Sequence, residues 1–187
     1  GELDNLTIKD NPGYSNLINL EMLVPMNDLL TRDTADFGGV IEQLTASDGN
    51  FYAVPFRSDF WVLFYNKDMF DQAGIDYPTN AFENGQATMC NMGSWFIATL
   101  QTYNAEAEAN GVEPVNFGMV KYPHPEGVEA GTTLGTVTSL GINPYSENQA
   151  AAADFINWCV SDEGAAAIAA TGTFPAVSNE QINDIIA

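Results

Sequence analysis

The sequence predicts an α/β fold, and three observations carry that prediction. The run from Phe51 to Tyr65 is rich in aromatic and β-branched residues, which is typical of one or two strands. Helix-start and helix-stop residues frame several later segments. Strand-like and helix-like segments alternate along the chain, and this alternation is the pattern of an α/β domain.

The first fifty residues are predicted to form short helices and turns before the strand run. Met26, Leu29 and Leu30 have the i, i+3, i+4 spacing of an apolar helix face. Within the strand run, Pro55 marks an edge or a break, because proline cannot donate a hydrogen bond to a ladder.

Capping residues locate the other predicted helices. Asn66 is expected to cap 67–73, which Gly74 ends, and Ser94 to cap 95–109, which Gly111 ends. Three more helices are predicted from the capping box Ser146–Gln149, from the N-cap Ser161 with a stop at Gly172, and from the capping box Ser178–Gln181. Further strands are predicted over 88–92, 116–122 and 132–143.

The charge of the chain is strongly negative and excludes two classes of partner. Of 187 residues, 25 are acidic and 5 are basic, giving a net charge of −20. Nucleic-acid binding needs clustered Lys and Arg to neutralise phosphates, and docking on anionic lipids needs the same. We interpret the acidity as a contribution to solubility.

The two cysteines, Cys90 and Cys159, have neither C-x-x-C spacing nor a nearby histidine, which argues against a zinc site. They form either one disulfide in an exported chain or two buried thiols. No catalytic residue, metal ligand or cofactor is predicted.

Three segments, in a fixed order, carry a resemblance to a known family. They are Tyr52-Ala53-Val54-Pro55 with Leu63 to Phe70, Phe82 to Met89 with Gly93-Ser94-Trp95, and Leu140 to Asn143 with Ser146 to Gly164. These segments are similar to the runs y-x-i-P … l-x-Y-N-k-d-l-F, F-x-n-G-k-a-A-M … G-x-W and g-I … S-k-n … F-i … E-g. The chain thus resembles the extracellular sugar-binding proteins of ATP-driven importers, the maltose-binding-protein-like family 1 solute-binding proteins.

The chain also departs from that family's pattern. Family members are longer, begin with a strand and helix that nothing here matches, and carry more sequence between the positions of Asn80 and Ala81. The chain is therefore expected to be a fragment, a shortened relative or a chain with segments left out. The resemblance implies a periplasmic-binding-protein-like (type II) fold of two lobes with a hinge, incomplete here. The expected parts are 1–80 in the N-terminal lobe and start of the crossover, 81–115 in the C-terminal lobe, 116–145 returning through the hinge, and 146–187 as C-terminal-lobe helices.

The function that the resemblance implies is capture of a sugar or oligosaccharide and its delivery to the membrane permease of an ABC importer. The expected protein is a monomer, extracellular, held as a cell-surface lipoprotein or in a bacterial periplasm. A carbohydrate-active hydrolase and a truncated, non-binding interaction module are the alternatives. Release of smaller sugars would indicate the hydrolase, and no response to any solute would indicate the interaction module.

Sugar recognition needs polar groups that hydrogen-bond hydroxyls and an aromatic ring that packs on the apolar sugar face. The resemblance places Asp59 where the family has an acidic ligand contact and Trp95 at its stacking tryptophan. Strand alternation puts Arg57, Asp59 and Trp61 on one face. The expected picture is an indole and a carboxylate facing each other across a gap between two lobes.

Other readings of these residues stay open. Arg57 and Asp59 form a surface salt bridge in one alternative, and Arg57 holds an anionic ligand in another. Trp61 is equally consistent with core packing, and Trp158 is expected in the core. Asn91, Thr136 and Thr138 are weaker ligand-binding candidates.

Overall fold

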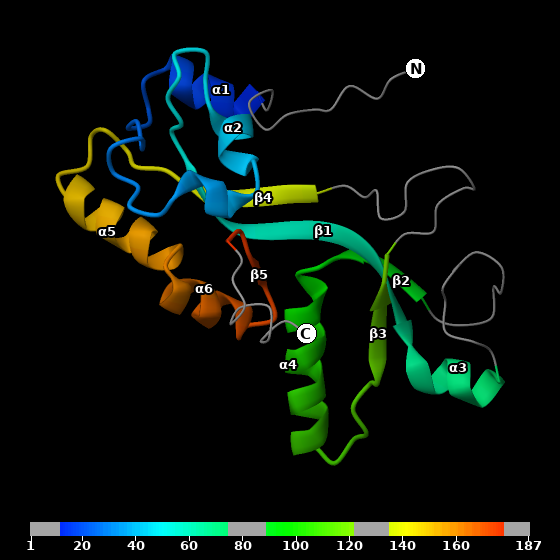
Figure 1. The fold of residues 1–187 in the computed structure, drawn as a ribbon. Coiled ribbons are helices and arrows are strands. Elements are labelled where there is room, and N and C mark those ends of the chain that lie inside the picture. Colours follow the sequence, from blue (N-terminus) through cyan, green and yellow to red (C-terminus); the bar gives the residue numbers. More distant parts are fainter. Residues whose placement is uncertain (1–11, 75–88, 122–134, 178–187) are drawn as a thin grey trace, which may run out of the picture. The chain divides into compact units, whose positions relative to one another are not determined.

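The computed structural model describes residues 12–74, 89–121 and 135–177 (Figure 1). Helices and strands interleave through these residues, so the predicted α/β class is confirmed. The elements are α1 (Pro12–Asn19), η2 (Thr34–Phe37), α2 (Val40–Leu44), β1 (Val54–Asn66), α3 (Lys67–Ala73), β2 (Met89–Gly93), α4 (Phe96–Ala109), β3 (Phe117–Val120), β4 (Gly135–Leu140), α5 (Gln149–Cys159), α6 (Asp162–Ala169) and β5 (Phe174–Pro175).

The chain divides into two compact units. Unit 1 comprises Gly1–Ser58, Val137–Ala170 and Phe174–Ala187, and unit 2 comprises Asp59–Thr136 and Thr171–Thr173. Strand β1 contributes to both, because the division falls between Ser58 and Asp59. The lobe boundaries at 80, 115 and 145 stay a prediction.

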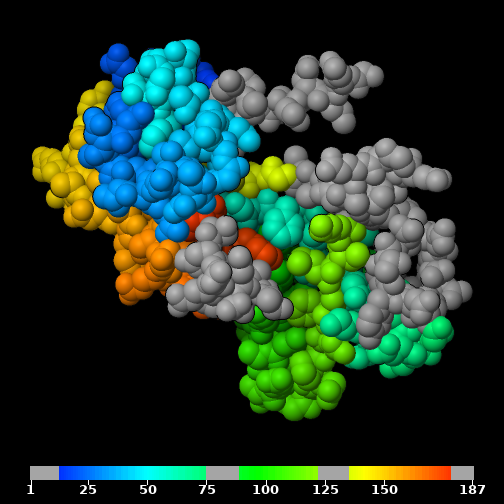
Figure 2. Space-filling model, viewed as in Figure 1, coloured from blue at the N-terminus to red at the C-terminus, as the bar shows by residue number. Residues whose placement is uncertain are grey.

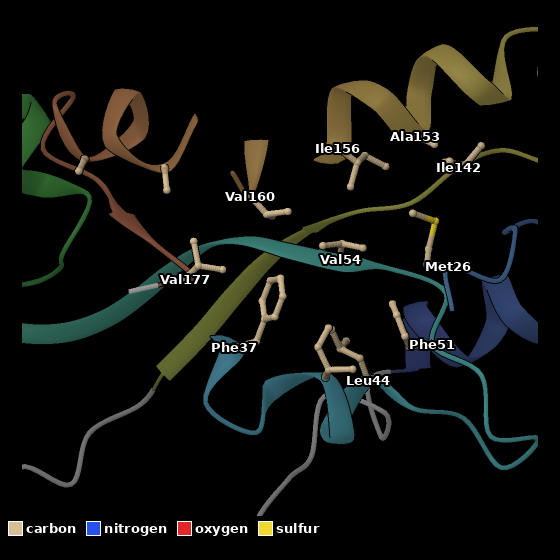
Figure 3. Close-up of a cluster of buried hydrophobic side chains, with 13 residues drawn as sticks. Met26, Phe37, Leu44, Phe51, Val54, Ile142, Ala153, Ile156, Val160 and Val177 are labelled. Carbon is tan, nitrogen blue, oxygen red and sulfur yellow. The ribbon is translucent and has the colours of Figure 1, made fainter. Parts of the chain in front are cut away.

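The core of unit 1 joins the early helices to the late ones. Figure 3 shows Phe37, Leu44 and Val54 pointing toward the same cluster as Ile156 and Val177. Helix α5 contributes Ala153 and Ile156, whose three-residue spacing places both on one face. In Figure 2 the blue and cyan atoms of residues 12–58 accordingly lie against the yellow and orange atoms of α5 and α6.

The segment after Met26 forms a turn, and the predicted short helix there is wrong. Leu30 N donates to Met26 O at 2.9 Å, which makes one helical turn. The next amide, Thr31 N, donates instead to Asn157 Oδ1 of α5 at 2.9 Å. Asn157 Nδ2 also donates to Leu29 O at 2.8 Å, so a side chain of α5 takes the backbone groups that a longer helix would have used.

In unit 2, strands β2 and β3 pair antiparallel with β1, in the order β2-β1-β3. Trp61 lies opposite Gly93, Leu63 opposite Asn91, and Tyr65 opposite Gly118. Directly opposed residues in an antiparallel pair share a face of the sheet. The opposite face carries Phe64, whose ring meets Phe96 of α4 edge-on at 5.4 Å.

Two of the predicted helix caps are confirmed. Asn66 accepts a hydrogen bond from Met69 N at the start of α3, and Gly74 ends α3 in the left-handed conformation with φ 65°. Ser161 accepts one from Gly164 N at the start of α6. The Ser178–Gln181 box lies outside the described residues.

Two other cap predictions are wrong because the serine hydroxyls and their neighbours have different partners. The N-cap position of α4 is Trp95 rather than Ser94, and Ser94 Oγ bonds to Asp59. The N-cap of α5 is Asn148, whose backbone N–H donates to Ser146 Oγ at 3.1 Å. Gln149 Nε2 donates to Pro144 O at 2.7 Å and so does not complete a box.

Both cysteines are free thiols, so the disulfide alternative is wrong, and of the two thiols predicted to be buried only Cys159 is buried. Cys159 is 5% exposed, and burial raises the pKa of its thiol. Cys90, on β2, is partly exposed. Among the described helices, none combines the length and apolarity needed to cross a bilayer.

We expect the two thiols to differ sharply in reactivity. In the native chain at pH 8, Cys90 should react with a disulfide reagent such as dithiobis-nitrobenzoate roughly 100-fold faster than Cys159, which is buried and holds less thiolate. Absorbance should report one fast thiol and a second only in denaturant. Failure to find two thiols in denaturant without reductant would contradict the free state of both.

Candidate ligand-binding site

A buried carboxylate forms the centre of the candidate site. Asp59 is 3% exposed and Ser94 is completely buried. Ser94 Oγ donates to Asp59 Oδ1 at 3.4 Å and accepts from Phe60 N at 3.3 Å, while Ser94 N donates to Phe60 O at 2.8 Å. The turn between β2 and α4 is thereby joined to β1 at Asp59. This burial rules out the surface position that the salt-bridge alternative required.

Two indole rings belong to residues that adjoin the Asp59–Ser94 bond along the chain: Trp61 follows Asp59 by two residues on β1, and Trp95 directly follows Ser94. Trp61 and Trp95 meet edge to face, with ring centroids 5.4 Å apart and planes at 82°. Trp95 lies over Gly93, because a Cβ added at Gly93 would come within 2.1 Å of its ring. Both tryptophans are partly exposed. The pair is therefore a right-angled apolar corner that keeps access to solvent.

Asn91 extends the site along the same face of β2. It is exposed and lies two residues before Gly93, so it shares the face of Trp61. Unit 2 thus brings together four of the five predicted site residues: Asp59, Trp61, Asn91 and Trp95. Asp59 and Trp95 both belong to unit 2, whereas the sequence predicted them on opposite lobes; the assignment of lobes stays a prediction.

Two of the three remaining candidates, Arg57 and Thr138, belong to unit 1, and Thr136 belongs to unit 2. Arg57 belongs to unit 1, where it pairs with Pro175 of β5. Thr136 is an exposed residue of β4 in unit 2, and Thr138 is in unit 1.

Trp158 is 44% exposed, so its predicted core position is wrong. It lies two residues, about 200° of rotation, past the buried Ile156 of α5, and this places it on the outer side of the helix. It stacks on Phe155 there, with planes at 25°.

Sequence reasoning missed what Gly93 and Ser94 do. The Gly93-Ser94-Trp95 order is visible in the sequence, whereas the position of the Trp95 ring over Gly93 depends on the fold. The bond between Ser94 and Asp59 spans 35 positions, and no local pattern announces it.

Unit 1 has a separate hollow of about 440 Å³, lined by Tyr14, Ser15, Ile18, Asn19, Thr45, Ala46 and Ser47. Tyr14 Oη at its wall donates to Leu44 O at 2.9 Å and accepts from Tyr52 N at 3.0 Å. Burial raises the pKa of Tyr14. The hydroxyl is thus committed to the backbone, and we assign no ligand to this hollow.

The sequence pattern of one family matches more than half of the chain. Residues 76–185 match a family described as bacterial extracellular solute-binding protein, and residues 18–80 match a second family with the same description. The chain belongs to the bacterial extracellular solute-binding proteins. No curated protein sequence matches it significantly.

Solved structures of solute-binding proteins have the same fold. A sugar transporter from Rhizobium etli in an open conformation is 30% identical, with a TM-score of 0.70 over 94% of this chain. An ABC substrate-binding protein from Listeria monocytogenes in complex with cycloalternan is 16% identical, with a TM-score of 0.67 over 92% of this chain. The GacH receptor of Streptomyces glaucescens, solved unliganded and with acarbose, is 15% identical, with a TM-score of 0.68 over 91%.

This solute-binding chain spans 66% of each of those three solved chains, just under two thirds of their length. The family and these neighbours are described as binding or transport proteins rather than enzymes.

Proposed function

We propose that the protein containing this chain captures a neutral sugar or oligosaccharide and passes it to the permease of an ABC importer. One observation carries the proposal: unit 2 holds a buried carboxylate that is bonded to Ser94, and two perpendicular, partly exposed indoles at Trp61 and Trp95. A carboxylate accepts strong hydrogen bonds from sugar hydroxyls, and an indole face packs on the C–H face of a pyranose. A site built in this way discriminates by hydroxyl position and ring shape, as a sugar carrier must.

The named ligands of the neighbours support this choice of ligand class. Cycloalternan and acarbose are bound by the Listeria and Streptomyces proteins, and the Rhizobium protein is described as a sugar transporter. Sugars and oligosaccharides are rich in hydroxyl groups. The same chemistry is available here from Asp59, Asn91 and the tryptophan corner.

We place unit 1 and unit 2 in the two lobes of such a carrier and propose that the ligand is enclosed by hinge closure. Strands β1 and β4 both cross from one unit to the other, so these two strands are the proposed hinge. Arg57, on β1, is proposed to contact the ligand. We further propose a monomer that works outside the cytoplasmic membrane as a lipoprotein or periplasmic protein, and that does not alter its ligand.

Titration calorimetry with a sugar panel tests the proposal. The panel contains maltotriose, mannotriose, a chitin oligosaccharide and a set of monosaccharides, and each mixture is analysed chromatographically afterwards. Binding with the sugar recovered intact is the expected result. Recovery of shorter sugars would indicate a hydrolase, and absence of binding across the panel would indicate a non-binding module.

Replacing Trp95 with alanine should weaken binding of the best panel sugar about 10- to 100-fold, because buried aromatic anchors contribute on this scale. Folding should be retained, since the ring is partly exposed. Calorimetry gives the affinity and circular dichroism gives the fold. Trp158→Ala is the matched control: it removes an exposed indole from unit 1 and should leave the affinity unchanged. Equal affinities for Trp95→Ala and the unchanged chain would remove Trp95 from the site.

A further inference from the structure

We propose that Ser94 is a positioning residue that aims the Asp59 carboxylate at the ligand, an inference that rests on the proposed function. Ser94 is completely buried, so its side chain does not reach a ligand that approaches from solvent. Its influence on binding therefore acts through the groups it contacts, Asp59 and Phe60.

The contacts of the Ser94 hydroxyl define the direction of its proton. Phe60 N donates to Ser94 Oγ at 3.3 Å, which uses an oxygen lone pair. The hydroxyl proton is then directed to Asp59 Oδ1, 3.4 Å away. A serine hydroxyl has one proton to donate, so this arrangement requires the carboxylate oxygen to be an acceptor.

This arrangement bears on the class of ligand. A carboxylate that accepts from Ser94 at one oxygen keeps further lone pairs on both oxygens, and these suit ligand groups that donate. Hydroxyl groups of neutral sugars donate, whereas the carboxylate of an acidic sugar does not. A carboxylate that Ser94 holds toward the ligand thus favours neutral polyols over anions.

The same short turn also places the tryptophan. Gly93, Ser94 and Trp95 are consecutive: the indole covers Gly93, and Ser94 N donates to Phe60 O at 2.8 Å. The bond from Ser94 N to Phe60 O holds the turn against β1. The bond from Ser94 Oγ to Asp59 Oδ1 holds the carboxylate against the same turn. Carboxylate and indole are therefore set relative to each other by one anchored residue.

The magnitude of the expected effect follows from the geometry. A separation of 3.4 Å is long for an O–H···O bond, so the bond restrains the carboxylate and is not strong in itself. We expect Ser94→Ala to weaken binding of the best panel sugar about three- to tenfold, the scale of one ordinary lost hydrogen bond.

The test is a double-mutant cycle in sugar affinity, made on the full chain. Ser94→Ala, Asp59→Ala and the double variant are titrated with the panel sugar that the unchanged chain binds most tightly. Ser94→Thr keeps the hydroxyl and should restore most of the affinity. Ser161→Ala is the matched control, because it removes an N-cap hydroxyl in unit 1 and should lower stability without changing affinity.

The proposal predicts that Ser94→Ala has no further effect once Asp59 is alanine. Additive losses, or an unchanged affinity in Ser94→Ala, would overturn the positioning role. If the Asp59→Ala chain fails to fold, the comparison of Ser94→Ala with Ser94→Thr decides the question. An equal loss of affinity in both variants overturns the proposal, and recovery of affinity in Ser94→Thr supports it. The unchanged chain is titrated first. If it binds no panel sugar, the proposed function itself fails, and this result is known before any variant is made.

Discussion

Replacing Gly93 with alanine should abolish most of the sugar affinity, about 10- to 100-fold, matching the loss expected for Trp95→Ala. The added Cβ would come within 2.1 to 2.4 Å of three ring carbons of Trp95, a separation at which the indole must move. Moving it breaks the edge-to-face contact with Trp61 at 5.4 Å. Calorimetry measures the affinity, and the near-ultraviolet circular dichroism of the tryptophans reports the displaced ring.

Overpacking also lowers stability, by about 1–3 kcal/mol, and this loss must be separated from the effect on the site. Gly118→Ala provides the control, because its Cβ would come within 2.4 Å of the Tyr65 ring on the same sheet. Tyr65 lies four residues along β1 from Trp61, roughly 13 Å away at the usual rise per residue. Gly118→Ala should lose stability and keep affinity. Equal affinity losses in the two variants would show that crowding of the sheet, rather than the indole position, weakens binding.

Elements whose signals are local could be predicted from the sequence. The aromatic run gave one strand of 13 residues, Val54–Asn66, with Pro55 near its start, where a missing amide proton costs little. Asn66 and Ser161 act as caps because their partners, Met69 N and Gly164 N, lie three residues away. Such bonds depend on the neighbouring sequence alone.

Predictions failed where a distant residue competed for the same group. Ser94 was expected to cap a helix, but its hydroxyl bonds to a carboxylate 35 positions away. The helix expected after Met26 ends because Asn157 takes the amide of Thr31, 126 positions away. Trp158 was expected inside because it is large and apolar, yet the buried side of α5 is set by what packs against it.

The candidate site, too, was predicted where the signal is local and missed where it depends on distant residues. The resemblance identified Asp59 and Trp95, and strand alternation placed Trp61 on the face of Asp59. That Trp95 stands edge to face with Trp61 follows from the register of β2 on β1, which puts Gly93 opposite Trp61. Trp61 and Gly93 lie 32 positions apart, and register over that separation is a tertiary property, so the corner could not be derived before the structure.

The core of unit 1 packs around the start of β1, the strand that carries Asp59 and Trp61. Phe37→Ala should destabilise this core. Phe37 is 2% exposed and points into the cluster with Leu44, Val54 and Val177 (Figure 3). Removing a buried phenyl ring costs about 3–5 kcal/mol, a large part of the roughly 5–15 kcal/mol that stabilises a typical domain. Urea denaturation followed by circular dichroism measures the loss.

Phe155→Ala is the matched control for this loss, because it removes the same side chain from the same unit at a position that is 58% exposed. Its cost should stay below about 1 kcal/mol, since little apolar area returns to water. Val54 opens β1 within the core, and Asp59 and Trp61 follow on the same strand. Phe37→Ala should therefore also reduce sugar affinity as the urea concentration approaches its lowered midpoint, whereas Phe155→Ala should not. A destabilisation below 1 kcal/mol for Phe37→Ala would show that the ring contributes little to the cluster in which it lies.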